Sequence, residues 1–338
     1  GSGFLNAVDA TAQGAFVKEN NLITGVSAYN GTVFLCVPRW RHGVPSTLNT
    51  LHINASTGEP YLKPFPNWKW QTEVLHYVQA VYVDVPRGRL WIIDTGRENF
   101  MDANPDRLQN RAAALYVMDI ATQEILYNIS FPDSIFPYNS SFLNDIRVDP
   151  TSGTRAYMTD TNTAGLGAIV AVDVTTGLMR RVENNFTRAQ PGYVVDVGGV
   201  LFPGVQSPSD GIALSSDGST LLFSVITGSR IFAVSTSMLL DVSVPQEDIA
   251  AATRIVVDKG TSSDGMDWID SVTTVEGGDA VSYVLYGDFV ADGLAALSLH
   301  NGAVSSSSQS STHGAVTLGA DSDSLEWVDT IVAQRASA

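Results

Sequence analysis

The sequence predicts an all-β protein: a single domain over residues 1–338, folded as a six-bladed β-propeller with four-stranded antiparallel blades. The main observation is a repeated pattern in which an apolar run, a glycine-containing turn and a second apolar run follow one another. Copies of this pattern begin near residues 23, 79, 143, 208, 263 and 327. Repeats that each hold several strands are typical of propellers, because one blade cannot bury its faces alone. Helical periodicity is nearly absent, which supports the same fold class.

Each copy is predicted to form two strands joined by a tight turn. The pairs Asn30-Gly31, Ser152-Gly153 and Asp217-Gly218 stand where such a hairpin needs positive φ. We expect short helical turns only around 105–113 and 236–242, and long loops on one face at 39–78, 97–113 and 187–207. Residues 3–21 are expected to complete the sixth blade, because the last copy is truncated.

The composition narrows the classes of partner. The net charge is −16 and no run of Lys or Arg is longer than two residues, which argues against a nucleic acid or an anionic membrane as partner. Hydrophobic residues make up 44% of the chain, enough for a large core, yet no apolar stretch reaches the length of a membrane span. We expect a monomer that binds a small aromatic or terpenoid ligand. The lone Cys36, inside an apolar run, is expected to be a buried structural thiol.

The sequence also indicates a secreted glycoprotein. Five N-x-Ser/Thr sequons occur, at Asn30, Asn54, Asn128, Asn139 and Asn185. Gly1 and Ser2 resemble residues left by cloning, so we expect that a signal peptide has been removed.

Aligning the repeats on their turn glycines gathers polar residues near the propeller axis. The starts of the first strands place Gln79, Asn144, Ser209 and Ser263 in one ring, and Asp145, Asp210, Asp264 and Asp329 in the next. The second strands end on the same face, in Asp94-Thr95, in residues 160–162, at Thr227 and in Asp288-Phe289. This face is therefore the predicted ligand site.

Several motifs resemble those of one protein family. VPRWRHGVPSTLN (37–49), LWIIDTGR (90–97), NDIRVD (144–149) and LEWVDTIVA (325–333) are similar to motifs of the Yellow/major royal jelly protein family, in its order and spacing. The resemblance implies a six-bladed propeller that is usually secreted and binds small molecules at its axis. Family members do not share one chemistry: some rearrange dopachrome-like quinones, some bind biogenic amines, and some fungal members catalyse a cofactor-free hetero-Diels–Alder cyclisation.

The leading hypothesis from this resemblance is a cofactor-free enzyme of secondary metabolism. It would act on an oxygenated aromatic molecule, most concretely as an intermolecular cyclase that joins a tropolone quinone methide to a terpene. Such catalysis needs an apolar slot and well-placed hydrogen-bond donors. The expected slot residues are Trp40, Trp68, Trp70, Tyr138 and Phe289, and the expected hydrogen-bonding residues are Arg97, His42, Asn144, Asn162 and Thr227.

Three alternatives remain open. A non-catalytic binder would attract a cationic amine or catechol to Asp145, Asp210 and Asp264. A dopachrome-type tautomerase would instead need one titrating group. A lactonase would hold Ca²⁺ on the same acidic ring, but the recurrence of Asp at one repeat position favours carboxylates that accept backbone N–H bonds within their blades. No resident cofactor is expected.

Overall fold

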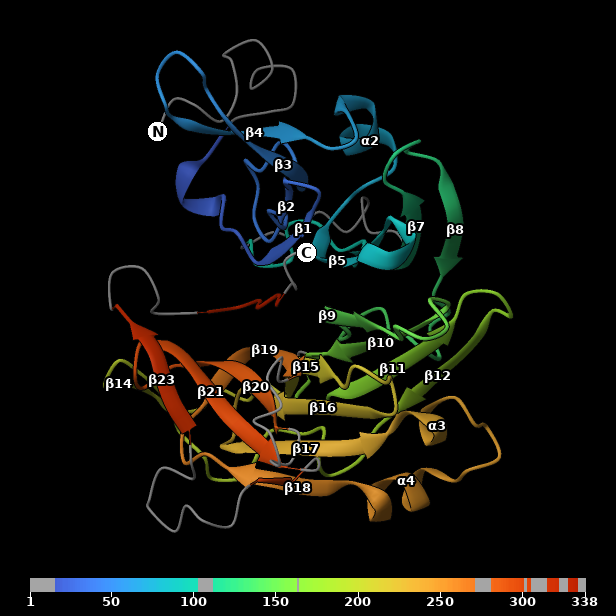
Figure 1. Ribbon diagram of the computed structural model, residues 1–338, viewed down its shortest axis with the longest axis vertical. Helices are drawn as coiled ribbons and strands as arrows, with labels where there is room; N and C mark the ends of the chain where they lie inside the picture. Colours follow the sequence, from blue (N-terminus) through green and yellow to red (C-terminus); the bar gives the residue numbers. More distant parts are fainter. Residues whose placement is uncertain are drawn as a thin grey trace, which may run out of the picture. The chain divides into compact units, whose positions relative to one another are not determined.

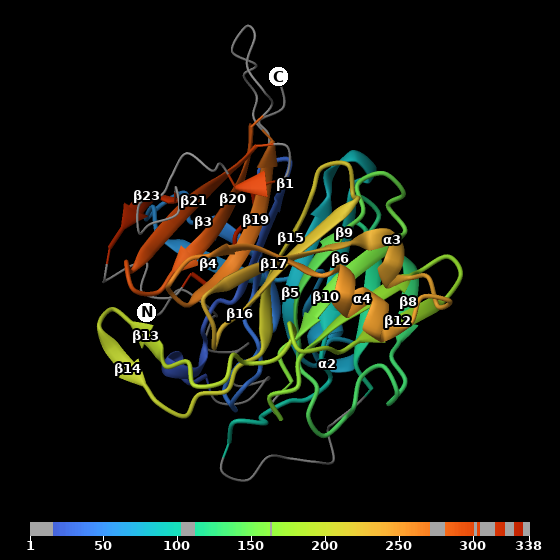
Figure 2. The same cartoon turned by 90° about the horizontal axis from the view of Figure 1, so that it is seen from below.

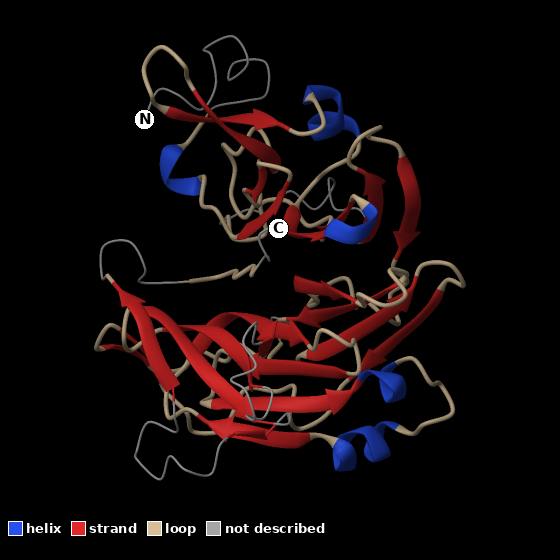
Figure 3. Cartoon of the chain, in the orientation of Figure 1, coloured by secondary structure: helices blue, strands red, loops and turns tan. Residues whose placement is uncertain are grey.

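The structure, a computed structural model, describes residues 16–102, 112–162, 164–270, 281–300, 303–304, 315–321 and 328–333. They belong to two compact units, Gly1–Tyr138 and Asn139–Ala338. Both units consist mainly of antiparallel sheets, with a few short helices in the connections (Figure 1, Figure 3). No helix in the described ranges is long and apolar enough to cross a membrane.

The first unit holds two four-stranded sheets whose strands pair in chain order. The first sheet consists of β1 (Gly25–Tyr29), β2 (Thr32–Cys36), β3 (Leu48–Ile53) and β4 (Pro60–Pro64). The second consists of β5 (Val78–Asp84), β6 (Arg89–Asp94), β7 (Ala114–Asp119) and β8 (Ile125–Ser130). Helix α2 (Trp68–Glu73) connects the two sheets, and 3-10 turns occur at Lys18–Asn20 and Val85–Arg87.

The second unit repeats this arrangement three times. Its first sheet consists of β9 (Leu143–Val148), β10 (Arg155–Asp160), β11 (Ala168–Asp173) and β12 (Leu178–Val182). The second consists of β15 (Ser209–Leu214), β16 (Thr220–Val225), β17 (Arg230–Ser235) and β18 (Arg254–Asp258). The third consists of β19 (Ser263–Asp270), β20 (Val281–Asp288), β21 (Gly293–His300), β22 (Ala303–Val304) and β23 (Ala315–Ala320). Helices α3 (Thr236–Leu239) and α4 (Gln246–Ala252) follow β17. A separate hairpin, β13 (Val195–Val197) and β14 (Val200–Phe202), extends away from these sheets (Figure 2).

Strands that pair antiparallel in chain order form the blade of a propeller, so the predicted all-β propeller class with four-stranded blades is confirmed. Five described sheets begin at Gly25, Val78, Leu143, Ser209 and Ser263, close to the predicted starts. The predicted sixth start, at 327, lies outside the described residues, and 328–333 form no strand.

Most first strands contain a β-bulge near their start. Between β5 and β6, Val78 pairs with Asp94 and Ala80 with Ile93, which leaves Gln79 as an extra residue. Equivalent register shifts occur in the β9–β10, β15–β16 and β19–β20 pairs, whereas β1 and β2 pair without one. Bulges bend a strand and change the direction of its side chains.

Apolar residues from neighbouring sheets form the cores. In the first unit, Phe34 and Cys36 pack with Val81 and Ile92, which confirms that Cys36 is buried. In the second unit, one cluster joins the β9–β12 and β15–β18 sheets and another joins β15–β18 to β19–β23. This burial is the main stabilising term for each unit.

Three expectations about local structure need correction. The segments 39–78 and 187–207, expected to be loops, contain strands β3 and β4 with helix α2, and the β13–β14 hairpin. Helix α3 confirms the predicted turn at 236–242 and residues 103–111 lie outside the described residues, but helices α2 and α4 were not predicted. Residues 16–21 form a 3-10 turn rather than a strand, and Val17 N–H donates to Gly43 O. The described part of 3–21 therefore contributes no strand to a sixth blade.

Candidate functional site

Arg39, in the VPRW segment, forms hydrogen bonds between the loop after β2 and neighbouring segments of the first unit. Its guanidinium donates to the backbone carbonyls of Val44, Pro45, Gln71, Leu75 and His76 at 2.9–3.1 Å. It also forms an ion pair with Glu98, at 2.8 Å between Nη1 and Oε1. Carbonyls in a loop lack ladder partners, and one planar guanidinium can satisfy several of them. The most distinctive motif of the sequence is therefore built around a structural arginine.

The loop after β6 is bonded to this arginine loop. Asn99 N–H donates to Arg39 O at 2.8 Å, and Met101 N–H donates to Trp40 O at 3.0 Å. His42, expected to be a proton donor, is exposed and lies 3.2 Å from the Asp102 carboxylate. Backbone hydrogen bonds thus join the two loops in one assembly within the first unit.

A buried histidine–carboxylate pair lies within this assembly. His76 Nδ1 is 3.3 Å from Glu98 Oε1, the same oxygen that accepts from Arg39. The backbone of His76 is fixed as well, because its N–H donates to Asp94 Oδ2 at 2.7 Å. Burial alone would raise the pKa of Glu98, but the hydrogen bonds and charges of His76 and Arg39 outweigh burial, so the pKa is lowered. Glu98 is therefore a stable carboxylate beside an imidazole.

The other ring nitrogen of His76 has a different environment. Within the described part of the chain, Nε2 is buried and has no hydrogen-bond partner. The same holds for Trp40 Nε1 and Thr95 Oγ1, which belong to segments bonded to His76 or its neighbours. Buried polar atoms usually have a partner, so such a group in a folded protein points to a function or to a bound molecule.

Aromatic and cationic side chains lie next to this pair. The Arg97 guanidinium is 5.4 Å from the centroid of the Phe100 ring, and Phe100 is 6.0 Å from the ring of Tyr77. The Tyr77 hydroxyl donates to Gln79 Oε1 at 3.1 Å. Burial raises the pKa of Tyr138, and the charge of Arg97 opposes this. The structure therefore brings Arg97 and Tyr138 into the same neighbourhood, as expected.

The two tryptophans of the long loop belong to helix α2. The Asn67 side chain accepts from Trp70 N–H and caps the helix. Trp70 packs on the core of the first unit and is 6.4 Å from Tyr116, while Trp68 is half-buried at the start of the helix. Trp70 is thus largely a packing residue, and a ligand role for Trp68 stays a prediction.

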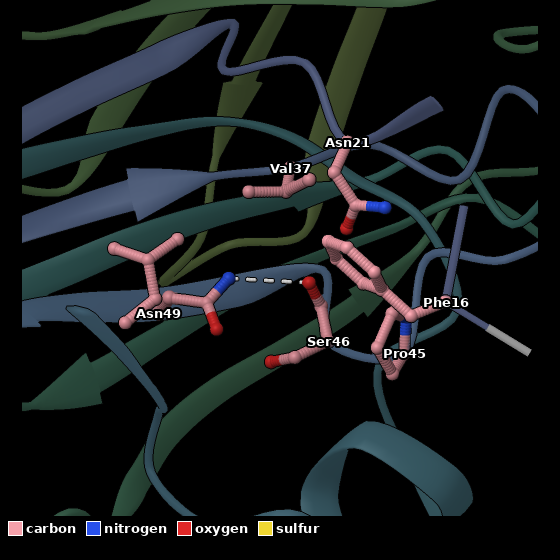
Figure 4. Close-up of a pocket in the computed structure, with 7 residues that line it drawn as sticks. Phe16, Asn21, Val37, Pro45, Ser46 and Asn49 are labelled. Carbon is pink, nitrogen blue, oxygen red and sulfur yellow. Dashed lines mark hydrogen bonds between the residues drawn. The ribbon is translucent and has the colours of Figure 1, made fainter. Parts of the chain in front are cut away.

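A small cavity lies beneath the second half of the VPRW motif. Its walls are Phe16, Asn21, Val37, Pro45, Ser46, Asn49 and Leu62 (Figure 4), and its volume is about 10 Å³. Asn49 Nδ2 donates to Ser46 O across it. A cavity of this size holds one water molecule at most, so it is not a substrate site.

In the second unit, Asp145 takes part in a buried ion-pair triad. Arg147 Nη1 is 3.0 Å from Asp145 Oδ2, and Arg147 Nε is 3.4 Å from Asp267 Oδ1. The guanidinium also donates to Met266 O and Ile331 O. Burial raises the pKa of Asp145 to about 6, and the Arg147 charge only partly opposes this.

Three further carboxylates meet beside this triad. Oxygens of Asp210, Asp264 and Asp329 lie within 4.8 Å of one another. Asn144 Nδ2 and Thr161 Oγ1 donate to Asp210. Burial, followed by the neighbouring carboxylates, raises the pKa of Asp210 and of Asp329 well above the usual value. Such a cluster holds protons, although its oxygens are also a donor set that suits Ca²⁺.

The remaining expected residues of the second unit make local contacts. Asn162 Nδ2 donates to Ser140 Oγ at 3.0 Å, and Thr227 Oγ1 donates to Val205 O at 3.2 Å. Phe289 is fully buried with Val195, at the base of the β13–β14 hairpin. The structure thus groups Arg97, Tyr138, Trp40 and His42 in the first unit and Asn144, Asp145, Asp210 and Asp264 in the second. Their membership of one site stays a prediction.

Sequence reasoning missed the His76–Glu98 pair. His76 stands just before the start of a first strand, and Glu98 stands just after the end of the paired second strand. Both ends lie at one edge of the hairpin, so their juxtaposition followed from the repeat alignment. The repeat alignment could therefore have identified the pair, but neither His76 nor Glu98 lies in a motif associated with catalysis.

Comparisons with known proteins agree with the repeat pattern. A family model described as "Major royal jelly protein" matches residues 78–276. Protein yellow from Drosophila yakuba is 30% identical over 243 residues, which cover 69% of this chain and 44% of that protein. L-dopachrome tautomerase yellow-f from Drosophila melanogaster is 33% identical over 133 residues, covering 37% of this chain and 30% of that protein.

A solved structure of the calcium-binding protein regucalcin from Agrobacterium tumefaciens is also similar, with 13% identity and a TM-score of 0.46 over 82% of this chain and 70% of that one. The chain spans less than half the length of the yellow proteins that it matches. With the family model matching residues 78–276 and the yellow proteins matching 69% of the chain, this protein belongs to the major royal jelly protein family.

Proposed function

We propose that this protein is a cofactor-free isomerase that moves a proton on a small, oxygenated aromatic or quinone-like molecule. The observation that carries the proposal is the buried His76–Glu98 pair, whose imidazole Nε2 has no partner in the described part of the chain. A histidine whose Nδ1 is held by a carboxylate presents Nε2 as a general base. The similarity to L-dopachrome tautomerase yellow-f over 133 residues supports this choice of reaction.

The proposed reaction needs one base and one oxygen-binding group. His76 Nε2 takes a proton from a carbon conjugated to the substrate carbonyl, and the electron pair of that C–H bond moves to the carbonyl oxygen. Glu98 stabilises the resulting imidazolium through Nδ1–H, and Arg39 keeps Glu98 ionised. Arg97, beside Phe100, stabilises the oxygen that gains charge. The imidazolium then returns its proton to the substrate, so the product is an isomer.

The test uses L-dopachrome and follows loss of its colour with the full chain. We expect His76→Gln to lower kcat/KM by about 100-fold, since general base catalysis contributes about 10²–10⁴-fold. Glu98→Gln should lower it by a smaller factor and shift the pH profile. His52→Gln is the matched control, because His52, on β3, contacts Thr50 on the same strand and Tyr61 on β4. No acceleration over buffer by the parent protein, or full activity of His76→Gln, would reject the proposal.

A hetero-Diels–Alder cyclase is the second candidate. The stacked Arg97, Phe100 and Tyr77 side chains favour it, because a flat quinone methide needs an aromatic surface and a donor for its oxygen. A tropolone alcohol and humulene are the test substrates. Under this mechanism Arg97→Ala should abolish stereocontrol, whereas His76→Gln should retain it. His76→Gln therefore separates the two candidates, because it should lower the isomerase activity and leave the stereocontrol of the cyclase unchanged.

We propose further that this protein is a secreted glycoprotein and that its propeller has six blades. The side chains of all five sequon asparagines are exposed: Asn30, Asn54, Asn128, Asn139 and Asn185. A sixth blade is supported by the outer face of the β19–β23 sheet, where Tyr283, Val316 and Leu318 are exposed around a cavity of about 580 Å³. Residues 328–333 already pack on this face through Ile331. Such an apolar face normally packs against a neighbouring blade.

A further inference from the structure

The β13–β14 hairpin of the second unit and the chain that follows it carry a run of exposed apolar residues. All residues from 198 to 206, with the sequence GGVLFPGVQ, are exposed. Val200, Leu201 and Phe202 are 58%, 62% and 43% exposed. Isolated exposed apolar side chains are common on protein surfaces, but a contiguous group of them marks an interaction site. We call residues 190–207 the apolar arm (Figure 2).

Backbone hydrogen bonds join the apolar arm to the sheets of the second unit at two places. At its turn, Gly198 has a φ of +55° and its N–H donates to Phe289 O at 2.8 Å. At its base, Thr227 O accepts from Gln190 N–H at 2.7 Å, and Thr227 N–H donates to Ser207 O at 2.9 Å. These bonds position the arm before any partner binds, which lowers the ordering cost of binding.

Strand β14 of the arm is exposed on both of its faces. Successive side chains of a strand point to opposite faces, so Leu201 lies on one face of the hairpin and Val200 and Phe202 lie on the other. All three residues are exposed, whereas Val195 and Val197 of the paired strand β13 are buried. A protein partner covers one surface and leaves a polar rim. A lipid phase surrounds an inserted segment on all sides, which matches the exposure of β14.

The apolar arm is also nearly free of charge. Asp196 is the one charged residue between Arg188 and Asp210, in a chain whose net charge is −16. Its carboxylate accepts from Gly199 N–H at 2.9 Å, at the turn of the hairpin. An anionic membrane would repel the chain as a whole, so the charge argument against such a surface still holds. A neutral lipid surface causes no such repulsion.

The size of the exposed segment argues against a second copy of the chain as its occupant. A stable protein–protein interface takes about 20–30 residues from each side, more than twice the length of the segment 198–206. Pro203, directly after β14, has no N–H to donate, which limits pairing of this edge with a strand of another chain. The short, uncharged segment is therefore better suited to lipid than to a protein.

We propose that the apolar arm is a lipid-contact site that inserts Val200, Leu201 and Phe202 into a neutral, zwitterionic lipid surface. Burial of these side chains is favourable in proportion to their apolar area. A single myristoyl chain binds a bilayer with about 10⁴ M⁻¹, and this short segment should bind no more strongly. The contact is thus reversible and independent of ionic strength. It does not rest on the proposed isomerase activity, which is assigned to His76 and Glu98.

The experiment measures co-sedimentation of the full chain with phosphatidylcholine vesicles over a range of lipid concentrations. Leu201→Ser is compared with Ile53→Ser, because Leu201 is 62% exposed and Ile53, on β3 of the first unit, is 60% exposed. We expect Leu201→Ser to lower the partition coefficient at least about tenfold, the factor that corresponds to one buried leucine side chain, and Ile53→Ser to leave it unchanged. Vesicles that contain phosphatidylglycerol should bind the parent more weakly, because the chain is acidic.

A second variant reports the position of the arm. Phe202→Trp should add fluorescence, relative to the parent, that vesicles of dibrominated phosphatidylcholine quench. Absence of binding to phosphatidylcholine, equal losses in Leu201→Ser and Ile53→Ser, or a lack of quenching in Phe202→Trp would overturn the proposal. A dimer in analytical ultracentrifugation that Leu201→Ser abolishes, without vesicle binding, would overturn it in favour of a second copy. L-dopachrome is absent from these measurements, so failure of the isomerase proposal would leave them unchanged.

Discussion

Each unit of this protein buries an arginine among acidic groups, but the two arginines have different neighbours. Arg39 faces one carboxylate, Glu98, which it shares with the imidazole of His76. Arg147 faces two carboxylates, Asp145 and Asp267, and a cluster of three more lies beside them. The first group therefore pairs one arginine with one carboxylate, whereas in the second group the carboxylates outnumber the arginine.

Similar repeats thus carry different arrangements of charge. In the first unit one carboxylate balances one arginine, and His76 Nε2 has no partner among the described residues, which is the basis of the proposed proton transfer. In the second unit the carboxylates outnumber the cations, and burial makes their ionised forms costly. We therefore expect the first group to act in chemistry and the second to affect stability.

The largest expected effect is on Arg147. Arg147→Met removes the cation from two buried carboxylates and from two backbone carbonyls, which should lower the free energy of unfolding by about 3–5 kcal/mol. Urea unfolding at pH 7 measures this. Arg155→Ala is the control, because Arg155 is half-exposed in its pair with Asp173 and should change stability by less than about 1 kcal/mol. Equal effects of the two variants would contradict the buried-triad interpretation.

A smaller effect is expected for Arg39. Arg39→Met leaves five loop carbonyls without this donor, but the side chain is 13% exposed, so water can replace part of the lost bonding. We expect a loss of about 2–3 kcal/mol in the free energy of unfolding. Activity toward L-dopachrome should fall further than stability does, because the ionisation of Glu98 depends on Arg39. Unchanged activity in a folded variant would separate Arg39 from the proposed site.

The smallest expected effect concerns the carboxylate cluster and its pH dependence. The pKa of Asp210 and of Asp329 is raised in the folded state, and that of Asp145 reaches about 6. A raised pKa means that the folded state binds more protons than the unfolded state above the ordinary value of 3.8. The contribution of these groups to stability is therefore largest at low pH and falls as pH rises above 3.8 through their folded-state pKa values, the value for Asp145 being about 6.

Asp329→Asn tests this dependence, because an amide can donate to Asp264 as a protonated carboxyl group would. We expect the variant to be more stable than the parent by about 1 kcal/mol at pH 7, with a smaller gain at pH 5. Asp217→Asn is the opposite control: hydrogen bonds from Ser215 and Ser219 lower the pKa of Asp217, so its loss should destabilise the protein at pH 7. Destabilisation by Asp329→Asn at pH 7 would indicate a bound cation instead.

The sequence was sufficient to predict the blades because strand alternation and turn glycines are local signals. Five sheet starts lie within two residues of the predicted positions. Helix α2 was missed because its short sequence, WKWQTE, has no helical periodicity, and it is stabilised by the Asn67 cap and by the buried amide of Gln71. Tertiary contacts of this kind are not visible in a local pattern.

The candidate site was predicted less well. The alignment of repeats placed Asp210, Asp264 and Asp329 in one ring, and their carboxylate oxygens do lie within 4.8 Å of one another, although Asp329 belongs to residues 328–333, which form no strand. It gave no weight to Arg39, whose importance comes from carbonyls in three separate segments.

The bulges at the starts of the first strands have an evolutionary consequence. An extra residue such as Gln79 or Gly265 is not part of the regular ladder, yet both are buried, and a Cβ on Gly265 would lie 2.7 Å from Asp329 O. A mutation at such a position therefore changes buried packing and not the exposed surface. We expect the four bulged positions to vary little among proteins with this architecture, so that differences in substrate arise at other positions.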